Sequence, residues 1–179
     1  MAITLRLATM DDVPALQKLI AESVRALSLP YYSAREIESA LAHVFGVDRQ
    51  LILDATYFVA ETEDQIVGCG RWSKRKTLFG GDQAHSVRVD ELLSPDTDAA
   101  RVRAFYVHPQ WSRRGIGSQI LEACEQAAVE SGFTVLELIA TLPGEPLYSA
   151  HGYDRVGPFE IPLPEGQSLP AFRMKKSLA

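Results

Sequence analysis

A β-loop-α-β unit between residues 101 and 140 constrains the fold more than any other part of the sequence. Residues 101–107 have the composition of a strand, residues 115–131 carry the apolar periodicity of a long helix, and residues 134–140 are strand-like again. Two glycines open the helix, whose first N–H groups lack intrahelical partners and carry partial positive charge. A glycine-rich turn that leads into such a helix favours an anion. The unit therefore predicts an α/β fold with an anion site where its helix begins.

The flanking sequence predicts one mixed-sheet α/β domain over residues 1–179. Thr9 is expected to cap a first helix that ends near Leu27, and Ser33 and Glu36 have the spacing of a capping box for a second helix that ends near Gly46. Residues 73–100 are irregular and longer than most connections inside a domain. A Pro-rich connection is expected before the last strand. The remaining strands are expected at residues 3–7, 55–61, 65–72 and 169–175, and short helices at 51–54 and 147–151.

Composition and charge narrow the class of protein. The chain is 46% hydrophobic and 23% charged, which is typical of globular proteins and not of disordered ones. It has no stretch of the length and hydrophobicity that a bilayer span requires, and its N-terminus lacks the pattern of a secretory signal, so we expect a cytoplasmic protein without a membrane partner. A net charge of −5 disfavours nucleic acid as a partner and favours a cationic or neutral substrate.

The two cysteines do not have the spacing of a metal site. Cys124 falls on the apolar stripe of the long helix and Cys69 lies within a strand pattern, so both are expected to be small buried side chains in a reducing compartment. We therefore expect no metal cofactor, and no cysteine that carries a covalent intermediate.

Two common phosphate-binding motifs fit the glycine turn poorly. A Walker-type loop needs four residues between its glycines and a following Lys-Ser or Lys-Thr, which Gly115 and Gly117 do not have. A dinucleotide fingerprint is a nearer alternative because Glu137 lies about 20 residues beyond the second glycine, where an acid would meet a ribose hydroxyl. However, Ile120 fills its third small position, and seven residues separate Val107 from Gly115 where that fold turns directly into a helix. A nicotinamide-dependent oxidoreductase stays as the alternative from another class.

The stretch FYVHPQWSRRGIGSQIL resembles the acyl-CoA-binding signature of the GNAT superfamily of N-acyltransferases, Q/R-x-x-G-x-G/A at the start of the helix after the fourth strand. Ser112 stands where that signature usually has Gln or Arg, and Arg113 and Arg114 follow it. The order of elements is similar over nearly the whole chain, except residues 73–100. The resemblance implies an α/β (α+β) fold with a mixed, mostly antiparallel central sheet, helices on both faces, and a splay between the fourth and fifth strands.

The resemblance also implies that acetyl-CoA is the co-substrate. Backbone N–H groups of the turn would hold its pyrophosphate, the fourth strand would pair with its pantetheine arm, and an N–H near Val107 would meet the oxyanion. The glycines remove Cβ atoms where the chain must approach the phosphates. The cofactor-binding residues that follow are Phe105, Tyr106, Val107, Ser112, Arg113, Arg114, Gly115, Ile116, Gly117 and Ser118.

Side-chain chemistry is expected mainly from Tyr148, which precedes Gly152 as in the Y-x-x-x-G-F/Y arrangement of the family, where the hydroxyl lies near the CoA sulfur. A phenol stays protonated at neutral pH and suits a general acid for the departing thiolate. Glu137, on the fifth strand, is the candidate general base, with a water chain as the alternative. Tyr31 and Tyr32, between the first two helices, are candidates for the wall of an acceptor pocket.

Together these features predict an enzyme that transfers an acetyl group from acetyl-CoA to a primary amine by direct transfer in a ternary complex. The acceptor is a small-molecule or peptide amine whose identity stays open. A non-catalytic acyl-CoA-binding or sensing protein on the same fold is the alternative. Many relatives form homodimers, although no feature of this sequence demands one.

Overall fold

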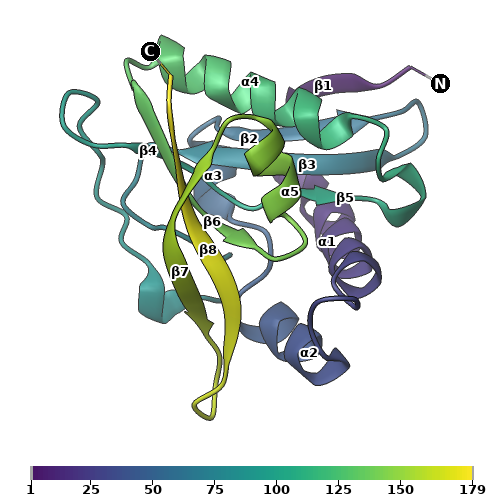
Figure 1. Ribbon diagram of the computed structural model, residues 1–179. Helices are drawn as coiled ribbons and strands as arrows, with labels where there is room; N and C mark the ends of the chain where they lie inside the picture. The colour runs from purple at the N-terminus through teal and green to yellow at the C-terminus, as the bar shows by residue number, and fades with distance from the viewer. Residues whose placement is uncertain (1, 179) are drawn as a thin grey trace.

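A twisted eight-stranded sheet with largely buried central strands forms the centre of the computed structural model, which describes residues 2–178 (Figure 1). The strand order is β1-β2-β3-β4-β6-β8-β7, with β5 paired to β3. β4 and β6 run parallel and the other paired strands run antiparallel, which confirms the expected mixed, mostly antiparallel sheet. The strands are β1 Thr4–Leu7, β2 Tyr57–Glu61, β3 Ile66–Ser73, β4 Ala100–Val102, β5 Tyr106–Val107, β6 Val135–Thr141, β7 Asp154–Pro162 and β8 Ser168–Ser177.

Helices cover both faces of the sheet, and each face has its own hydrophobic core. Helices α1 (Val13–Leu27), α2 (Ala34–His43) and α3 (Arg49–Leu53) share one core, and α4 (Ile116–Glu130) and α5 (Glu145–Ala150) share the other. The predicted capping box of α2 is present, since the Glu36 N–H donates to Ser33 Oγ at 3.1 Å and the Ser33 N–H donates to Glu36 Oε1 at 2.8 Å. None of the described helices is long and apolar enough to cross a membrane.

The strand predicted over residues 101–107 is split into β4 and β5, and the split opens the sheet. β4 pairs with β6 through Ala100 and Arg101, whereas β5 pairs only with β3, through Gly68↔Val107 and Cys69↔Tyr106, among the pairings of residues 2–178. Between the two short strands, Arg103 keeps a backbone bond to Arg71, with its N–H 2.7 Å from that carbonyl. Beyond this point β5 and β6 diverge, as the predicted splay requires.

The Pro-rich connection expected before the last strand is in fact a strand, β7, which forms a hairpin with β8. The prediction was wrong because Pro158 and Pro162 interrupt its strand pattern. Proline removes a donor from a sheet and is tolerated on an edge strand, where one side has no partner. β7 lies at the edge of the sheet, and among residues 2–178 it pairs only with β8. Its proline residues are therefore compatible with the strand.

The irregular segment 74–99 folds back on itself and docks against α2. The Thr77 N–H bonds the Val89 carbonyl at 3.0 Å, and an isolated bridge joins Arg75 to Leu92, so part of the segment extends the β3 end as an irregular hairpin. Its tip is tied to the loop after α2 by the Gly81 N–H, 2.7 Å from the Val44 carbonyl. This docking brings residues 78–80 to the gap in the sheet.

Candidate active site

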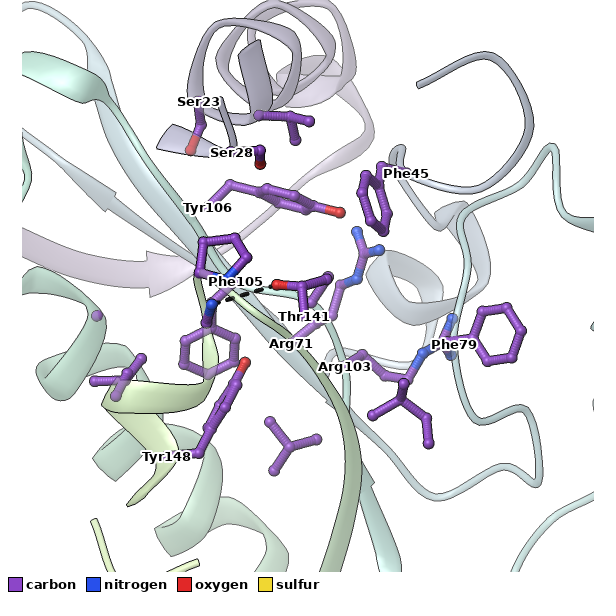
Figure 2. Close-up of a pocket in the computed structure, with 18 of the residues that line it drawn as sticks. Ser23, Ser28, Phe45, Arg71, Phe79, Arg103, Phe105, Tyr106, Thr141 and Tyr148 are labelled. Atoms are coloured by element: carbon purple, nitrogen blue, oxygen red, sulfur yellow. Dashed lines mark hydrogen bonds between the residues drawn. The ribbon is translucent and has the colours of Figure 1, made fainter. Parts of the chain in front are cut away.

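The divergence of β5 and β6 leaves a cavity of about 200 Å³ that reaches both faces of the sheet (Figure 2). Ser23 of α1 and Ser28, the residue that follows α1, line it on one face, and Gly117 of α4 and Tyr148 of α5 line it on the other. The split strand and segment 78–80 complete the wall. Arg71 and Arg103 are charged, and no carboxylate or histidine stands beside them among the lining residues that the structure describes.

The glycine turn has the backbone of a helix start whose first N–H groups are left without a side-chain cap. Gly115, the N-cap of α4, has φ +81° and no side-chain cap bond, and Arg113 has φ +60°. A Cβ at Gly117 would lie 3.2 Å from Leu147 Cδ2, whereas one at Gly115 would meet nothing within 4 Å. Glycine is therefore favoured at position 115 by its dihedral angle, and at position 117 a side chain would press on Leu147 of α5.

The polar side chains of the turn are used within it or lie at its mouth. Ser112 Oγ donates to the Pro109 carbonyl at 3.0 Å, and Ser118 Oγ lies 2.9 Å from His151 Nε2. The guanidinium of Arg114 stacks over Trp111 at 4.8 Å from the ring centroid, and Arg113 is exposed. Ile116 belongs to the core beneath α4. The backbone of the turn and its two arginines are thus the groups that face outward to an anion.

Val107 presents its N–H to α1 and not to a strand. That N–H bonds Ser23 Oγ at 3.2 Å, and Ser23 is buried and lines the cavity. The sequence analysis placed an N–H donor near Val107 but missed Ser23. Its signal was a serine within the apolar stripe of α1 between Ile20 and Val24, where a buried hydroxyl needs a partner.

Tyr148 is buried and reaches the cavity from the side opposite Ser23 (Figure 2). Its ring packs edge-on against Phe105 and Tyr153, with centroids 6.0 and 5.8 Å away. Its hydroxyl forms no hydrogen bond to any other described residue, so it is not tied to the backbone. Burial raises the pKa of the Tyr148 hydroxyl, which therefore stays protonated at neutral pH.

Glu137 lies outside the cavity lining, at the closed end of the gap. Its side chain is buried and pairs with Arg173, with Arg101 at 3.5 Å and with Lys175 at 3.9 Å. The Glu137 carboxylate is thus held by basic side chains of β4 and β8. In the dinucleotide alternative, a ribose hydroxyl would have to compete with these three cations for the carboxylate. Its assignment as a general base stays a prediction.

The two tyrosines between α1 and α2 also lie outside the cavity lining. The Tyr32 hydroxyl donates to the Pro170 carbonyl at 2.7 Å and accepts from the Leu142 N–H at 3.0 Å, which anchors the loop to β8 and β6. Tyr31 is exposed. Their role in acceptor binding stays a prediction without a contact to the cavity.

A buried cluster of charges that the sequence analysis missed forms one end of the cavity. Arg71 is 1% exposed and donates to the Tyr57 hydroxyl at 2.9 Å, and Arg103 is 3% exposed and donates to the Gly80 carbonyl. Asp48 is shared by Arg103 at 3.4 Å and Arg88 at 3.1 Å. Burial and the charge of Arg71 lower the pKa of Arg103 to about 10, so it stays charged at neutral pH.

The two cysteines are buried and line no part of the cavity. Burial raises the pKa of the Cys69 thiol to about 11 and that of Cys124 well above its ordinary value. A thiol that holds its proton is a poor nucleophile. The structure is thus consistent with the expectation that neither cysteine carries the acyl group.

Comparison with known proteins assigns the family. A family model of the acetyltransferase (GNAT) domain matches residues 54–155, more than half of the chain. An acetyltransferase from Stachybotrys chartarum is 27% identical in an alignment 197 positions long, which covers 89% of this chain and 84% of that protein.

Solved structures show the same fold. A GCN5-related N-acetyltransferase from Rhodopseudomonas palustris superposes with a TM-score of 0.72 at 19% identity, covering 99% of this chain and 97% of its own. The PaiA N-acetyltransferase from Thermoplasma acidophilum, solved in complex with coenzyme A, has a TM-score of 0.67 at 15% identity and 99% coverage of both chains. The segment that the family model matches contains the split strand, the glycine turn and Tyr148, and the chain belongs to the GNAT family of acetyltransferases.

Proposed function

We propose that the protein transfers the acetyl group of acetyl-CoA to a primary amine by direct transfer in a ternary complex. The observation that carries the proposal is the cavity through the sheet, which places the Tyr148 ring, the β5 backbone and the start of α4 around one space. The wall draws on elements from α1 to β7, which supports a single catalytic domain over the whole chain. Membership of the family and the coenzyme A bound to the PaiA protein support the donor.

The glycine turn would hold the pyrophosphate of the donor. The uncapped N–H groups at the start of α4 and the helix dipole favour an anion there, and Arg113 and Arg114 add positive charge at the mouth. The edge of β5 that faces away from β3 has no strand partner among the described residues, because β6 diverges at this point, and an extended pantetheine arm would pair with it.

The Val107 N–H would stabilise the oxyanion that develops on the acetyl carbonyl. A preformed backbone donor at a transition-state oxyanion is worth roughly 3–4 kcal/mol in other enzymes. In the present structure Ser23 Oγ accepts this N–H, so the carbonyl oxygen would take the place of the Ser23 hydroxyl. Ser23 then keeps the donor satisfied when no acyl group is present.

The Tyr148 hydroxyl would donate a hydrogen bond to the sulfur as the carbon–sulfur bond breaks. Because burial raises its pKa above that of an ordinary thiol, complete transfer of its proton is uphill, and stabilisation of the developing thiolate is its main contribution. The lining residues include no carboxylate or histidine among those described, so we assign deprotonation of the amine to water in the cavity.

The test is a calorimetric titration of the protein with acetyl-CoA, CoA and NADH, followed by a panel of amines with detection of the released thiol. Saturable binding of acetyl-CoA and thiol release with one amine class support the proposal. Binding without thiol release from any amine supports a sensing protein instead. Absence of CoA binding overturns the proposal at its first step, and Gly117→Trp, which fills the turn, is the negative control.

A further inference from the structure

The chemistry of the acceptor can be deduced from the charged end of the cavity, provided that the proposed transfer to an amine is right. The charged side chains of the lining are Arg71 and Arg103, and both are nearly inaccessible, at 1% and 3% exposure. Figure 2 shows Arg71 beside Tyr106 and Phe45, and Arg103 beside Phe79. This end of the cavity is therefore positively charged and walled by aromatic rings.

Arg71 has no ionic partner within the described chain. No carboxylate of residues 2–178 lies within 4.0 Å of its guanidinium, and its Nε is buried without a hydrogen-bond partner. The rings of Tyr57 and Tyr106 lie 5.1 and 5.9 Å from its Cζ and form cation–π contacts with the guanidinium. These contacts do not accept a hydrogen bond from the N–H groups of Arg71 that lack a partner. The hydroxyl of Tyr106 is likewise buried without a partner.

Arg103 does not supply the missing negative charge, because its own pairing is incomplete. It shares Asp48 with Arg88, and its Nε is also buried without a partner. Arg88 and Arg103 thus divide one buried carboxylate between them, and this carboxylate attracts Arg71 only from beyond ion-pair distance. The second acid of the cluster, Asp90, is exposed and pairs with Arg88 at 3.1 Å. The positive charge that has no carboxylate of residues 2–178 in ion-pair contact is that of Arg71, on the cavity wall.

We propose that the acceptor is a small amino carboxylate, whose carboxylate group binds Arg71 and the Tyr106 hydroxyl while its amine points to Tyr148 and Val107. A buried guanidinium with free donors is matched by a carboxylate, which accepts two parallel N–H bonds and neutralises the charge. Phe45, Phe79 and the remaining apolar wall suit a compact apolar side chain, because the cavity holds only about 200 Å³. The net charge of −5 favoured a cationic or neutral substrate, but the local field of the cavity has the opposite sign.

The step itself is a simple acyl transfer that needs no further reactant. The neutral amine nitrogen forms a bond to the acetyl carbon, the carbon–sulfur bond breaks, and the electron pair leaves on the thiolate of CoA. The amine proton leaves through water, and the Tyr148 hydroxyl hydrogen-bonds the sulfur.

The experiment compares matched acceptors that differ only in the anionic group. Leucine, leucinamide and isoamylamine are assayed by thiol release with saturating acetyl-CoA, together with phenylalanine, β-alanine and 4-aminobutyrate as variants of side chain and spacing. We expect at least one amino carboxylate to exceed its amide and its decarboxylated amine roughly 100-fold in kcat/KM. An aminophosphonate arm distinguishes a carboxylate site from a general anion site.

Arg71→Met separates the ionic role of the residue from its place in the core. Removal of an unpaired buried charge should preserve or raise the melting temperature, while the preference for the carboxylate is lost and the amide or amine gains. Arg101→Met is the matched control, because Arg101 is a partly buried arginine on the neighbouring strand that pairs with Glu137 and lies outside the cavity lining. It should keep the preference of the original protein.

The failure of this inference differs from the failure of the proposed function. If acetyl-CoA binds and amides or amines react as well as amino carboxylates, only the inference is overturned. The same holds if Arg71→Met keeps the preference. If no acceptor releases thiol, calorimetric binding of the amino carboxylates to the CoA-loaded protein decides: binding that Arg71→Met abolishes supports the carboxylate site, and no binding overturns it.

Discussion

At the scale of single residues, the proposed mechanism depends on two hydroxyl groups. The Tyr148 hydroxyl has no hydrogen-bond partner among residues 2–178, and Ser23 Oγ accepts the Val107 N–H, which in the proposed mechanism would turn to the carbonyl oxygen. The Tyr148 hydroxyl can therefore form its hydrogen bond in the transition state without first breaking another, whereas the Val107 N–H would exchange Ser23 Oγ for the carbonyl oxygen. Both groups are therefore best tested by substitutions that delete one oxygen atom.

Tyr148→Phe should lower kcat about 10- to 100-fold, because a hydrogen bond to a developing charge contributes roughly 1.5–3 kcal/mol. The affinity for acetyl-CoA, measured by calorimetry, should change little. Tyr153→Phe is the matched control, since its hydroxyl is also buried without a partner but its ring lies behind Tyr148, outside the cavity lining. Equal rates in the two variants would exclude Tyr148 from the chemistry.

The pH dependence of kcat/KM should follow the acceptor and not the enzyme. With no carboxylate or histidine among the described lining residues, the rate should rise with pH until the amine of the acceptor is neutral. Acceptors of different amine pKa should shift the midpoint of the profile accordingly. A midpoint near pH 6–7 that is the same for all acceptors would reveal a base on the protein, and Glu137→Gln would then be the first variant to assay.

At the scale of elements, the two glycines of the turn serve different purposes and should fail differently. Gly117→Trp should abolish binding of acetyl-CoA, because even a Cβ there lies 3.2 Å from Leu147. Gly115→Ala meets no atom within 4 Å but must adopt φ +81°, so it should lower the free energy of unfolding by roughly 1–2 kcal/mol and weaken binding less. Calorimetry with acetyl-CoA and urea denaturation measure the two effects separately.

Local signals in the sequence were sufficient to predict most elements and to nominate part of the candidate site, whose roles stay predictions. The glycine turn and Tyr148 were found because each belongs to a short motif, and Ser33 and Glu36 because a capping box is local. β7 was missed because its proline residues are tolerated only at a sheet edge, and the edge is a property of the whole sheet. The cluster around Arg71 joins residues from positions 48 to 103, and no spacing rule connects such distant positions.

At the scale of the whole molecule, the interior holds several thiol and phenol groups whose protonated form is favoured by burial in the fold. Burial raises the pKa of the Cys69 thiol from its ordinary value near 9 to about 11, and that of Tyr106 from 10 to about 12. Both groups belong to the layer around Arg71, which therefore links the stability of the fold to pH.

The free energy of unfolding should fall as the pH rises above about 9. Both groups have a folded pKa above the unfolded value, so their protonated forms are favoured in the native state, and stability is lost from the unfolded pKa upward. Each group contributes roughly 1.4 kcal/mol per pH unit within its window. Urea denaturation between pH 7 and 11 measures this, and Cys69→Ala should reduce the slope between about pH 9 and 11. A flat profile over this range would contradict the burial of these groups.

The docked segment 74–99 has a consequence for how such an enzyme changes over time. The proposed donor end of the cavity is built from the sheet and α4, whereas residues 78–80 enclose the proposed acceptor end from outside the sheet, next to Arg71 and Arg103. Substitutions in this segment can reshape the acceptor end while the turn, Val107 and Tyr148 keep their positions. In the proposed mechanism, Arg71 of β3 fixes the anionic group of the acceptor, whereas segment 74–99 shapes the rest of its pocket. Selection can then alter the side chain that the enzyme accepts without rebuilding the acyl-transfer machinery.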